Sequence, residues 1–275
     1  MIITLLSDNN NYNKSLLSTE HGLSMYIEYN DKKILCDMGA SDIFANNAKL
    51  LNINPFDIDF AFVSHAHSDH SGGLTHFLDN SSCKVFLSKE VFTNNYYSIR
   101  QNSYKNLSID KSLEISYYNR YVFINSSYWI DDKSIAIVKT EVNNYNKPIF
   151  NKYLYKQDAN KLILDDFAHE LSLVFNTSKG LVIISSCSHQ GVGNIVESCK
   201  EFTKVDKVYA FVGGLHIIDS EFAEKEAKDV YNFFKYKSNN TRIYSGHCTG
   251  LIAKNFLVNS DLDVSLFHVG KQIII

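Results

Sequence analysis

The segment HAHSDHSGG at residues 65–73 constrains most strongly what this chain can fold into. The apolar residues 60–64 precede it and have the aromatic and β-branched composition of a buried strand. The short segment after this strand contains several imidazole and carboxylate groups, which are suitable ligands for zinc, iron, manganese and nickel. We therefore predict a metal site at this strand end, with four candidate ligands: His65, His67, Asp69 and His70.

The spacing within this segment indicates which of its ligands could bind the same metal ion. In an extended segment, alternate side chains point to the same side, so His65, His67 and Asp69 are expected to converge. His70 would point elsewhere and is placed to serve a second ion. Gly72 and Gly73 then let the backbone turn into the next predicted helix.

Three further histidines follow predicted strands and lie beside glycines: His189 in SHQG, His216 in GGLH and His247 in GHCTG. A buried, hydrogen-bonded histidine is the ordinary alternative at any one of them. Three such positions in one chain, added to the first segment, favour metal ligands. The histidines that lack this context are interpreted as structural: His76, His169 and His268.

Strand-like and helical patterns interleave along the chain. Apolar, β-branched runs predict strands at residues 2–6, 24–29, 33–37, 60–64, 84–87, 121–124, 135–138, 171–175, 181–185, 207–212, 242–244 and 272–275. Helical periodicity is found at residues 42–51, 73–78, 191–202, 222–237 and 251–257. These elements predict an α/β fold with two mixed sheets and helices outside. Residues 90–166 are the least regular, and we expect there an insertion or hairpin over the site, or a surface excursion without a role.

Composition excludes several classes of function. The chain has 275 residues, 27 Lys plus Arg against 30 Asp plus Glu, and a formal charge of −3, which argues against nucleic-acid binding. Its longest apolar stretch, residues 208–218, is far shorter than the roughly 20 residues that a membrane span needs. The first residues do not resemble a signal peptide, and the five cysteines are scattered. A cytoplasmic protein with reduced thiols is expected.

The motifs together resemble the metallo-β-lactamase superfamily. They run in its order from Asp37 in ILCDMG through HAHSDHSGG to His189 and His247. The resemblance spans essentially the whole chain and implies an αββα sandwich, formed as a single domain of residues 1–275. It also implies a role for Asp37 in orienting the ligand loop, as carboxylates behind metal-bound imidazoles do.

The resemblance implies two metal sites. His65, His67 and His189 would hold the first ion, and Asp69, His70 and His247 the second. Many members carry an aspartate that bridges the two ions, and here the corresponding strand end offers His216. A neutral imidazole cannot bridge two cations, so the number of divalent ions, one or two, stays open. Zinc is expected first, with manganese, iron or nickel as alternatives.

A narrower group is also similar to this chain. EHGLS at residues 20–24, Asp165-Asp166, CSHQGVGNI at residues 187–195, GGLH and GHCTG resemble the subfamily of 7,8-dihydropterin-6-yl-methyl-4-(β-D-ribofuranosyl)aminobenzene-5′-phosphate synthase.

Metal-activated water makes a hydrolase the main expected function, acting on a small phosphorylated or ester-type metabolite. Asp69 would hold the water and accept its proton, and His216 and His21 are candidate proton donors to the leaving group. Two alternatives stay open: a condensing enzyme that joins a dihydropterin to a ribosylated aminobenzene phosphate, and a metal-binding ligand sensor without turnover. The expected partner is a small molecule, and the oligomeric state is left open.

Overall fold

The computed structural model describes residues 1–12, 16–101 and 103–275, which form two compact units. Unit 1 comprises Met1–Ile124, Tyr153–His169 and His268–Ile275. Unit 2 comprises Asn125–Lys152 and Glu170–Phe267. The single domain expected over residues 1–275 stays a prediction. Across the described part of the chain, no helix has the length and apolar character that crossing a membrane requires.

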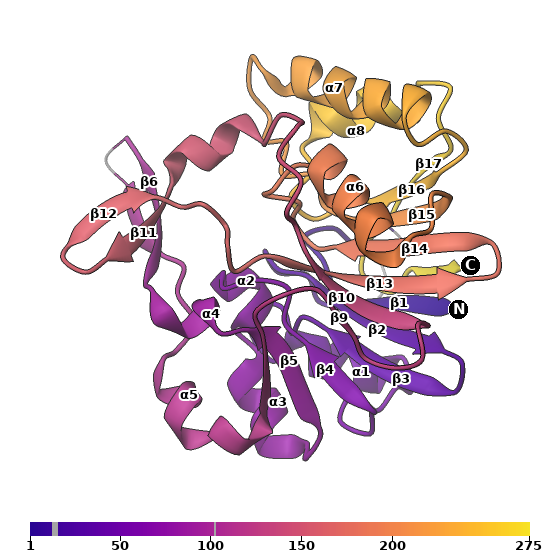
Figure 1. The fold of residues 1–275 in the computed structure, drawn as a ribbon. Helices are drawn as coiled ribbons and strands as arrows, with labels where there is room; N and C mark the ends of the chain where they lie inside the picture. Colours follow the sequence, from indigo (N-terminus) through magenta and orange to yellow (C-terminus); the bar gives the residue numbers. More distant parts are fainter. Residues whose placement is uncertain (13–15, 102) are drawn as a thin grey trace. The chain divides into compact units, whose positions relative to one another are not determined.

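A mixed sheet forms the centre of unit 1 (Figure 1). Counted across the sheet from β18 (Gln272–Ile274), the first four strands pair antiparallel, and each of the last three pairs parallel with the strand before it. This arrangement sets the carboxyl ends of β3, β4 and β5 side by side at one edge. In spatial order, the described strands are β18 (Gln272–Ile274), β1 (Ile2–Ser7), β2 (Ser24–Tyr29), β3 (Lys32–Cys36), β4 (Phe60–Phe62), β5 (Lys84–Ser88) and β8 (Tyr121–Ile124).

Two helices supply most of the helical packing in unit 1. Helix α1 (Ile43–Leu50) contributes Phe44, and helix α3 (Leu74–Asn80) contributes Phe77, to a core shared with strand residues such as Leu35 and Val85. Complete burial of such side chains stabilises the unit by about 1.5–3 kcal/mol each. The shorter helices are α2 (Ser68–Ser71), α4 (Glu90–Thr93), α5 (Ser112–Ser116) and the 3₁₀ turn η1 (Tyr118–Arg120).

A small antiparallel sheet occupies part of the irregular region of residues 90–166. Strands β7 and β12 are exposed along their whole length, whereas β6 and β11 each begin with a buried residue. The position of this region over the site stays a prediction. In spatial order the strands are β12 (Lys161–Leu164), β11 (Leu154–Asp158), β6 (Tyr96–Arg100) and β7 (Ser103–Asn106).

Unit 2 has a mixed sheet of its own. Its strands β14 to β17 run parallel, and β13, β10 and β9 continue the sheet antiparallel. Helices α6 (Val192–Thr203), α7 (Ala223–Tyr236) and α8 (Leu251–Val258) pack against the sheet in one apolar core (Figure 1). The described strands, in spatial order, are β17 (Val264–Leu266), β16 (Arg242–Ser245), β15 (Val208–Gly213), β14 (Gly180–Ser185), β13 (Leu171–Thr177), β10 (Ile135–Lys139) and β9 (Tyr128–Trp129).

The predicted α/β class with mixed sheets and helices is confirmed, and one local expectation is wrong. Residues 65–69 are not one extended segment, because helix α2 begins at Ser68 and includes Asp69 and His70. His67 is the last extended residue, with ψ of 138°, and its carbonyl accepts the N–H groups of His70 and Ser71. The strict alternation of His65, His67 and Asp69 therefore does not apply.

Candidate metal centre

The ligand loop of unit 1 lies where two parallel strands end. Strand β4 ends at Phe62, three residues before His65, and Asp37 directly follows the end of β3. Cys36 pairs with Phe62 in the parallel register, so Asp37 and the ligand loop meet at the same edge of the sheet. Asp37 has a positive φ of 57°, a conformation that the surrounding hydrogen bonds maintain.

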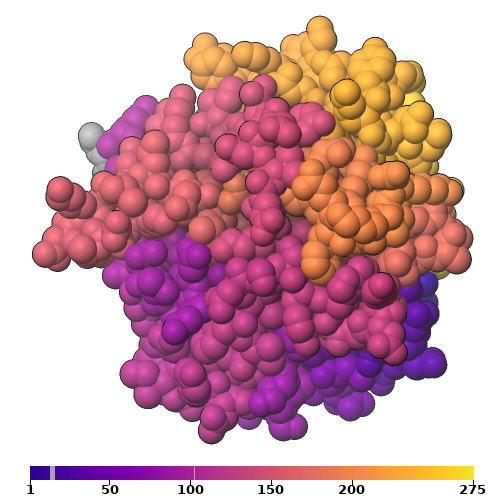
Figure 2. Space-filling view, viewed as in Figure 1, coloured from indigo at the N-terminus to yellow at the C-terminus, as the bar shows by residue number. Residues whose placement is uncertain are grey.

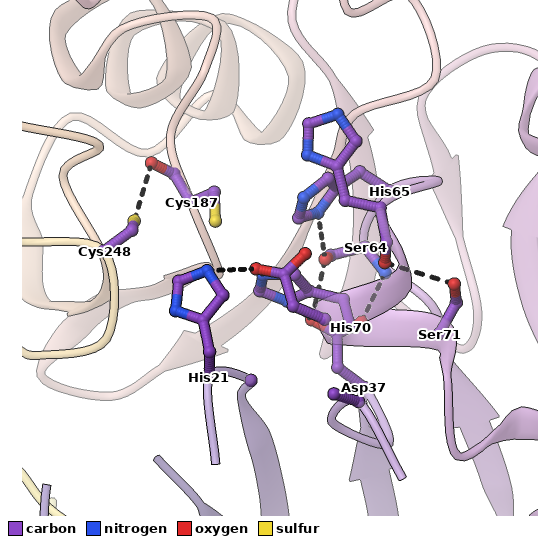
Figure 3. A network of polar contacts seen from close by, with 12 residues as sticks. His21, Asp37, Ser64, His65, His70, Ser71, Cys187 and Cys248 are labelled. Carbon is purple, nitrogen blue, oxygen red and sulfur yellow. Dashed lines mark hydrogen bonds and ion pairs between the residues drawn. The ribbon is translucent and has the colours of Figure 1, made fainter. Parts of the chain in front are cut away.

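Asp37 connects to the imidazoles through a buried hydrogen-bond network (Figure 3). Its Oδ1 accepts the Ser64 N–H at 2.7 Å, and its Oδ2 accepts the Ser64 hydroxyl at 2.7 Å and lies 2.8 Å from His70 Nδ1. The Ser64 Oγ lies 2.8 Å from His65 Nδ1. Since the carboxylate takes the hydroxyl proton, Ser64 Oγ accepts from His65, and Asp37 accepts from His70. Nε2 is then the atom that each ring would offer to a metal.

Burial keeps the imidazoles of His65 and His67 neutral. Burial and then the neighbouring histidines lower the pKa of His65 well below 6.5, and burial and then His169 lower the pKa of His67 to about 3. The His65 ring centroid lies 4.7 Å from that of His67 and 4.2 Å from that of His70. Neutral imidazole, the form of His65 and His67, is the form in which histidine binds metals.

Asp69 and His21 form a more open pair in the same unit. His21 Nε2 lies 3.4 Å from Asp69 Oδ2, and the His21 side chain is 61% exposed. On the other side of the ring, Nδ1 lies 3.0 Å from the Asn9 amide nitrogen. Asp69 Oδ2 is also 3.7 Å from His70 Nε2. The pair therefore links a ligand-bearing helix to solvent, and the catalytic roles of Asp69 and His21 stay predictions.

His169 supports the ligand loop, a contact that the sequence does not reveal. The Ala66 N–H donates to His169 Nδ1 at 3.2 Å, and Nε2 lies 3.1 Å from Asp165 Oδ2. Burial alone would raise the pKa of Asp165, but His169 lowers it below its usual value. Both ring nitrogens of His169 therefore have partners within unit 1, although ligand atoms of His67, Asp165 and His169 also lie within 4.8 Å of one another and could hold a metal. The structural role of His169 stays a prediction.

The histidines of unit 2 follow three neighbouring parallel strands. His189 comes after β14, His216 after β15 and His247 after β16, and the register places these strand ends together. His216 and His247 adopt positive φ values of 47° and 45°, which non-glycine residues rarely adopt and which cost about 1–3 kcal/mol each. This strain indicates that the surrounding contacts hold the two residues in place.

Those contacts explain the GGLH and GHCTG motifs. The Leu215 N–H donates to Thr249 Oγ1 at 3.0 Å, and the His216 N–H donates to Cys248 Sγ at 3.3 Å. A Cβ at Gly214 would lie 2.3 Å from Cys248 Sγ, so only glycine fits there. The two motifs therefore form one interlocked pair of strand ends.

His189 is positioned by residues that the sequence analysis missed. Its N–H donates to Glu170 Oε1 at 2.8 Å, and its Nδ1 lies 3.2 Å from Asn151 Oδ1. The His189 and His216 ring centroids are 4.1 Å apart. Glu170 and Asn151 occur without a recognisable motif, so no sequence signal would have identified them.

Two cysteines join His216 in a buried cluster. Ligand atoms of Cys187, His216 and Cys248 lie within 4.8 Å of one another. Both ring nitrogens of His216 are buried without a hydrogen-bond partner among the described residues. Burial would raise the pKa of Cys248, but contacts with Cys187 (Figure 3) and His216 lower it well below 9. Thiolate and imidazole are ligands for zinc and similar metals.

The donors therefore fit divalent metals in each unit. Neutral imidazoles and a carboxylate are present in unit 1, and imidazoles with two thiols in unit 2. The resemblance assigned one ion to His65, His67 and His189 and the other to Asp69, His70 and His247. Each set takes residues from both units, and the assignment stays a prediction. The role of His216 also stays a prediction.

Comparisons with known proteins agree on the family. The family model of the metallo-beta-lactamase superfamily matches residues 18–139. The 7,8-dihydropterin-6-methyl-4-(beta-D-ribofuranosyl)-aminobenzene-5′-phosphate synthase of Methanocaldococcus jannaschii is 31% identical, over 99% of this chain and 95% of that protein.

Solved structures share the fold. The crystal structure of Tm1679, described as a metal-dependent hydrolase of the beta-lactamase superfamily, is 28% identical with a TM-score of 0.81, over 100% of this chain and 99% of that one. Zn²⁺-bound PqqB from Methylobacterium extorquens has a TM-score of 0.56 over 100% of both chains, and at 9% identity it shows the fold alone. The predicted metallo-β-lactamase fold is confirmed.

The main functional expectation, a hydrolase that uses metal-activated water, is wrong. The relative that is 31% identical over nearly the whole chain is a synthase, which agrees with the condensing-enzyme alternative. The ligand motif predicts a metal, and a metal polarises a leaving group as readily as it activates water. The motif therefore did not determine which nucleophile attacks. Superfamily membership supports a metal-dependent enzyme in general.

Proposed function

Because this chain belongs to the metallo-beta-lactamase superfamily, we propose that it is a metal-dependent synthase of the dihydropterin type. It would join a 7,8-dihydropterin, through its 6-methyl carbon, to the amino nitrogen of a (β-D-ribofuranosyl)aminobenzene 5′-phosphate. The single observation that carries the proposal is the 31% identity to the synthase over 99% of this chain. The histidine and cysteine motifs that resemble that subfamily lie within the matched length.

The proposed reaction forms one bond and breaks one. The lone pair of the arylamine nitrogen forms a bond to the 6-methyl carbon. The bond from that carbon to an oxyphosphoryl leaving group breaks, and its electron pair stays on the phosphate oxygen. The nitrogen then loses one proton. A bound divalent metal would supply Lewis-acid stabilisation of the charge that develops on the leaving oxygen.

Six residues are the proposed metal holders: His65, His67, Asp69, His70, His189 and His247. Zinc is the expected metal because neutral imidazoles and a carboxylate suit it, although manganese, iron and nickel accept the same donors. Asp37 would keep His65 and His70 in the tautomers that present Nε2.

Asp69 is the proposed acceptor of the proton that the arylamine loses. His21 Nε2 lies 3.4 Å from Asp69 Oδ2, and its exposed ring would exchange this proton with solvent. His216 would contact a substrate or metal through ring nitrogens that have no hydrogen-bond partner among the described residues.

The test is the product mass after incubation of the metal-loaded protein with both substrates. We expect a condensed product whose mass equals the two substrates minus the protonated leaving group, and none when the arylamine is left out. A pterin alcohol as the sole product, formed with or without the arylamine, would contradict the proposal. Binding of both substrates with no conversion under any of the four metals would also contradict it, in favour of a ligand sensor.

A further inference from the structure

Unit 2 contains a cavity of about 380 Å³ beside the strand ends that carry His189 and His216. Residues 144–148, the first turn of α6, Leu215 and Ile217 after β15, and one face of α7 enclose it. Figure 2 shows the segment between β10 and the 3₁₀ turn η2 (Ile149–Tyr153) at the molecular surface, next to the orange α6. A volume of this size is typical of sites for small ligands.

Hydrogen bonds fix one wall of the cavity. Asn194 on α6 accepts the Tyr145 N–H with its Oδ1 at 2.8 Å and donates from Nδ2 to the Tyr145 carbonyl at 2.9 Å. A Cβ at Gly193 would lie 2.5 Å from the Tyr145 ring, so the ring packs directly on the helix backbone. Phe233 on α7 meets Tyr145 edge to face at 5.1 Å. The wall is therefore aromatic and held in place before any ligand binds.

The cavity also contains a buried carboxylate with an unused acceptor. Glu226 on α7 is only 8% exposed. Its Oε1 accepts the Ile149 N–H at 2.7 Å, whereas its Oε2 is buried without a hydrogen-bond partner among the described residues. A buried acceptor left unpaired has lost its hydrogen bonds to water, so a ligand that supplies a donor there recovers that free energy. Each carboxylate oxygen has two lone pairs, which leaves capacity on Oε1 as well.

We propose that this cavity binds the pterin ring of the substrate, with Glu226 accepting the hydrogen bonds of the ring's 2-amino group and adjacent ring N–H. This inference rests on the proposed function, which supplies the dihydropterin. A flat heterocycle whose edge carries two N–H donors matches a cavity that combines a buried carboxylate with an aromatic wall.

A phosphate group fits this cavity less well than a heterocycle. The lining includes two acidic residues, Glu226 and the more exposed Asp229, and two lysines, Lys147 and the exposed Lys237, so it offers an anion no excess of positive charge. The buried carboxylate of Glu226 would repel an anion. The Nζ of Lys147, another lining residue, already donates to Gln190 Oε1 at 2.6 Å. The cavity therefore favours a neutral, donor-rich ring.

The test compares pterin with lumazine, the analogue whose 2-amino group is replaced by a carbonyl oxygen. We expect the metal-loaded wild-type protein to bind 7,8-dihydropterin about 10- to 100-fold more tightly than dihydrolumazine in a titration followed by fluorescence or calorimetry. Glu226→Gln should weaken pterin binding by about the same factor and abolish the preference, because its amide replaces an acceptor by a donor. Glu224→Gln, an exposed substitution on the same helix, is the matched control and should leave both affinities unchanged.

Two results would overturn the inference: an unchanged pterin affinity in a folded Glu226→Gln variant, or equal affinities of the wild type for both rings. Circular dichroism and the melting temperature verify folding, and Glu226→Asp, which keeps the charge but shortens the reach, serves if the glutamine variant does not fold. Retained pterin preference without condensation would contradict only the proposed function. Condensation with an unchanged affinity in Glu226→Gln would contradict only the cavity assignment.

Discussion

The two units present metal-binding side chains in different ways. In unit 1, four of them lie within one short segment, and a single carboxylate on the adjacent strand, Asp37, orients two rings. In unit 2, the histidines come from three strand ends that are far apart in sequence, and surrounding contacts hold His216 and His247 at positive φ angles. Unit 2 also contains the cavity with Glu226.

This difference suggests a division of roles. In the unit 1 segment, hydrogen bonds predetermine the tautomers of His65 and His70, which is what stable metal binding needs. Unit 2 combines ligands with a concave aromatic wall and a buried carboxylate, which is what recognition of a ring needs. We interpret the cavity residues of unit 2 as those that would select one substrate, because function depends on the site more than on the fold.

The largest effect is expected from loss of a predicted ligand in unit 2. His189→Ala should lower the affinity for metal by more than about 100-fold, beyond the loss typical of an outer hydrogen bond. His268→Ala is the matched control, since His268 is also a buried histidine and its Nδ1 lies 2.8 Å from the Val269 carbonyl oxygen. Metal content per chain, measured by mass spectrometry after dialysis, decides the matter. Equal loss in both variants would contradict the division of histidines into ligands and structural residues.

A smaller loss is expected from the organising carboxylate of unit 1. Asp37→Asn places an amide donor where Oδ2 accepts from Ser64 and His70, so metal affinity should fall about 10- to 100-fold. The free energy of unfolding should fall by about 2–3 kcal/mol. Metal titration and chemical denaturation measure the two effects. Asp57→Asn, on the exposed surface, should change neither by a measurable amount, and similar behaviour of the two variants would show that Asp37 does not organise the loop.

The smallest effect is expected at the cavity wall of unit 2. Gly193→Ala should displace the Tyr145 ring, which a Cβ would approach to 2.5 Å. Overpacking costs about 1–3 kcal/mol, from which the better helix propensity of alanine recovers about 1 kcal/mol. Pterin affinity should fall several-fold while metal content stays unchanged. Glu201→Ala, an exposed substitution on the same helix, is the control. An unaltered pterin affinity in Gly193→Ala would show that the Tyr145 ring does not contribute to pterin binding.

Much of the fold follows directly from the sequence, because its central elements are strongly patterned. The predicted strand at residues 24–29 and helix at residues 222–237 match β2 and α7 almost residue for residue. The parallel strand ends that carry His189, His216 and His247 were likewise recognisable from apolar runs that end at polar motifs. For residues 90–166 the sequence predicted an insertion or hairpin but none of the strands of the small sheet, since β7 and β12 are exposed and lack an alternating pattern.

Parts of the candidate site depend on contacts between distant segments. Helix α2 is only four residues long, too short to show periodicity, so Asp69 was expected in an extended segment. In the sequence, Glu226 looks like any other acidic residue in the first turn of α7. Its distinct role depends on Ile149, 77 positions away, which donates its N–H to the Glu226 carboxylate. The hydrogen bond from the Ala66 N–H to His169 Nδ1 also joins segments 103 positions apart, which no local pattern encodes.

The formation of a carbon–nitrogen bond, instead of cleavage by water, is tested most directly by running the reaction in H₂¹⁸O. The metal-loaded protein is incubated with the ribosylated aminobenzene phosphate and with the dihydropterin that carries the oxyphosphoryl leaving group. The masses of the products are then measured by mass spectrometry. We expect the condensed product, with no ¹⁸O in it, because nitrogen takes the position of the leaving oxygen. A pterin alcohol or a phosphate that carries ¹⁸O, without condensed product, would contradict the proposed synthase.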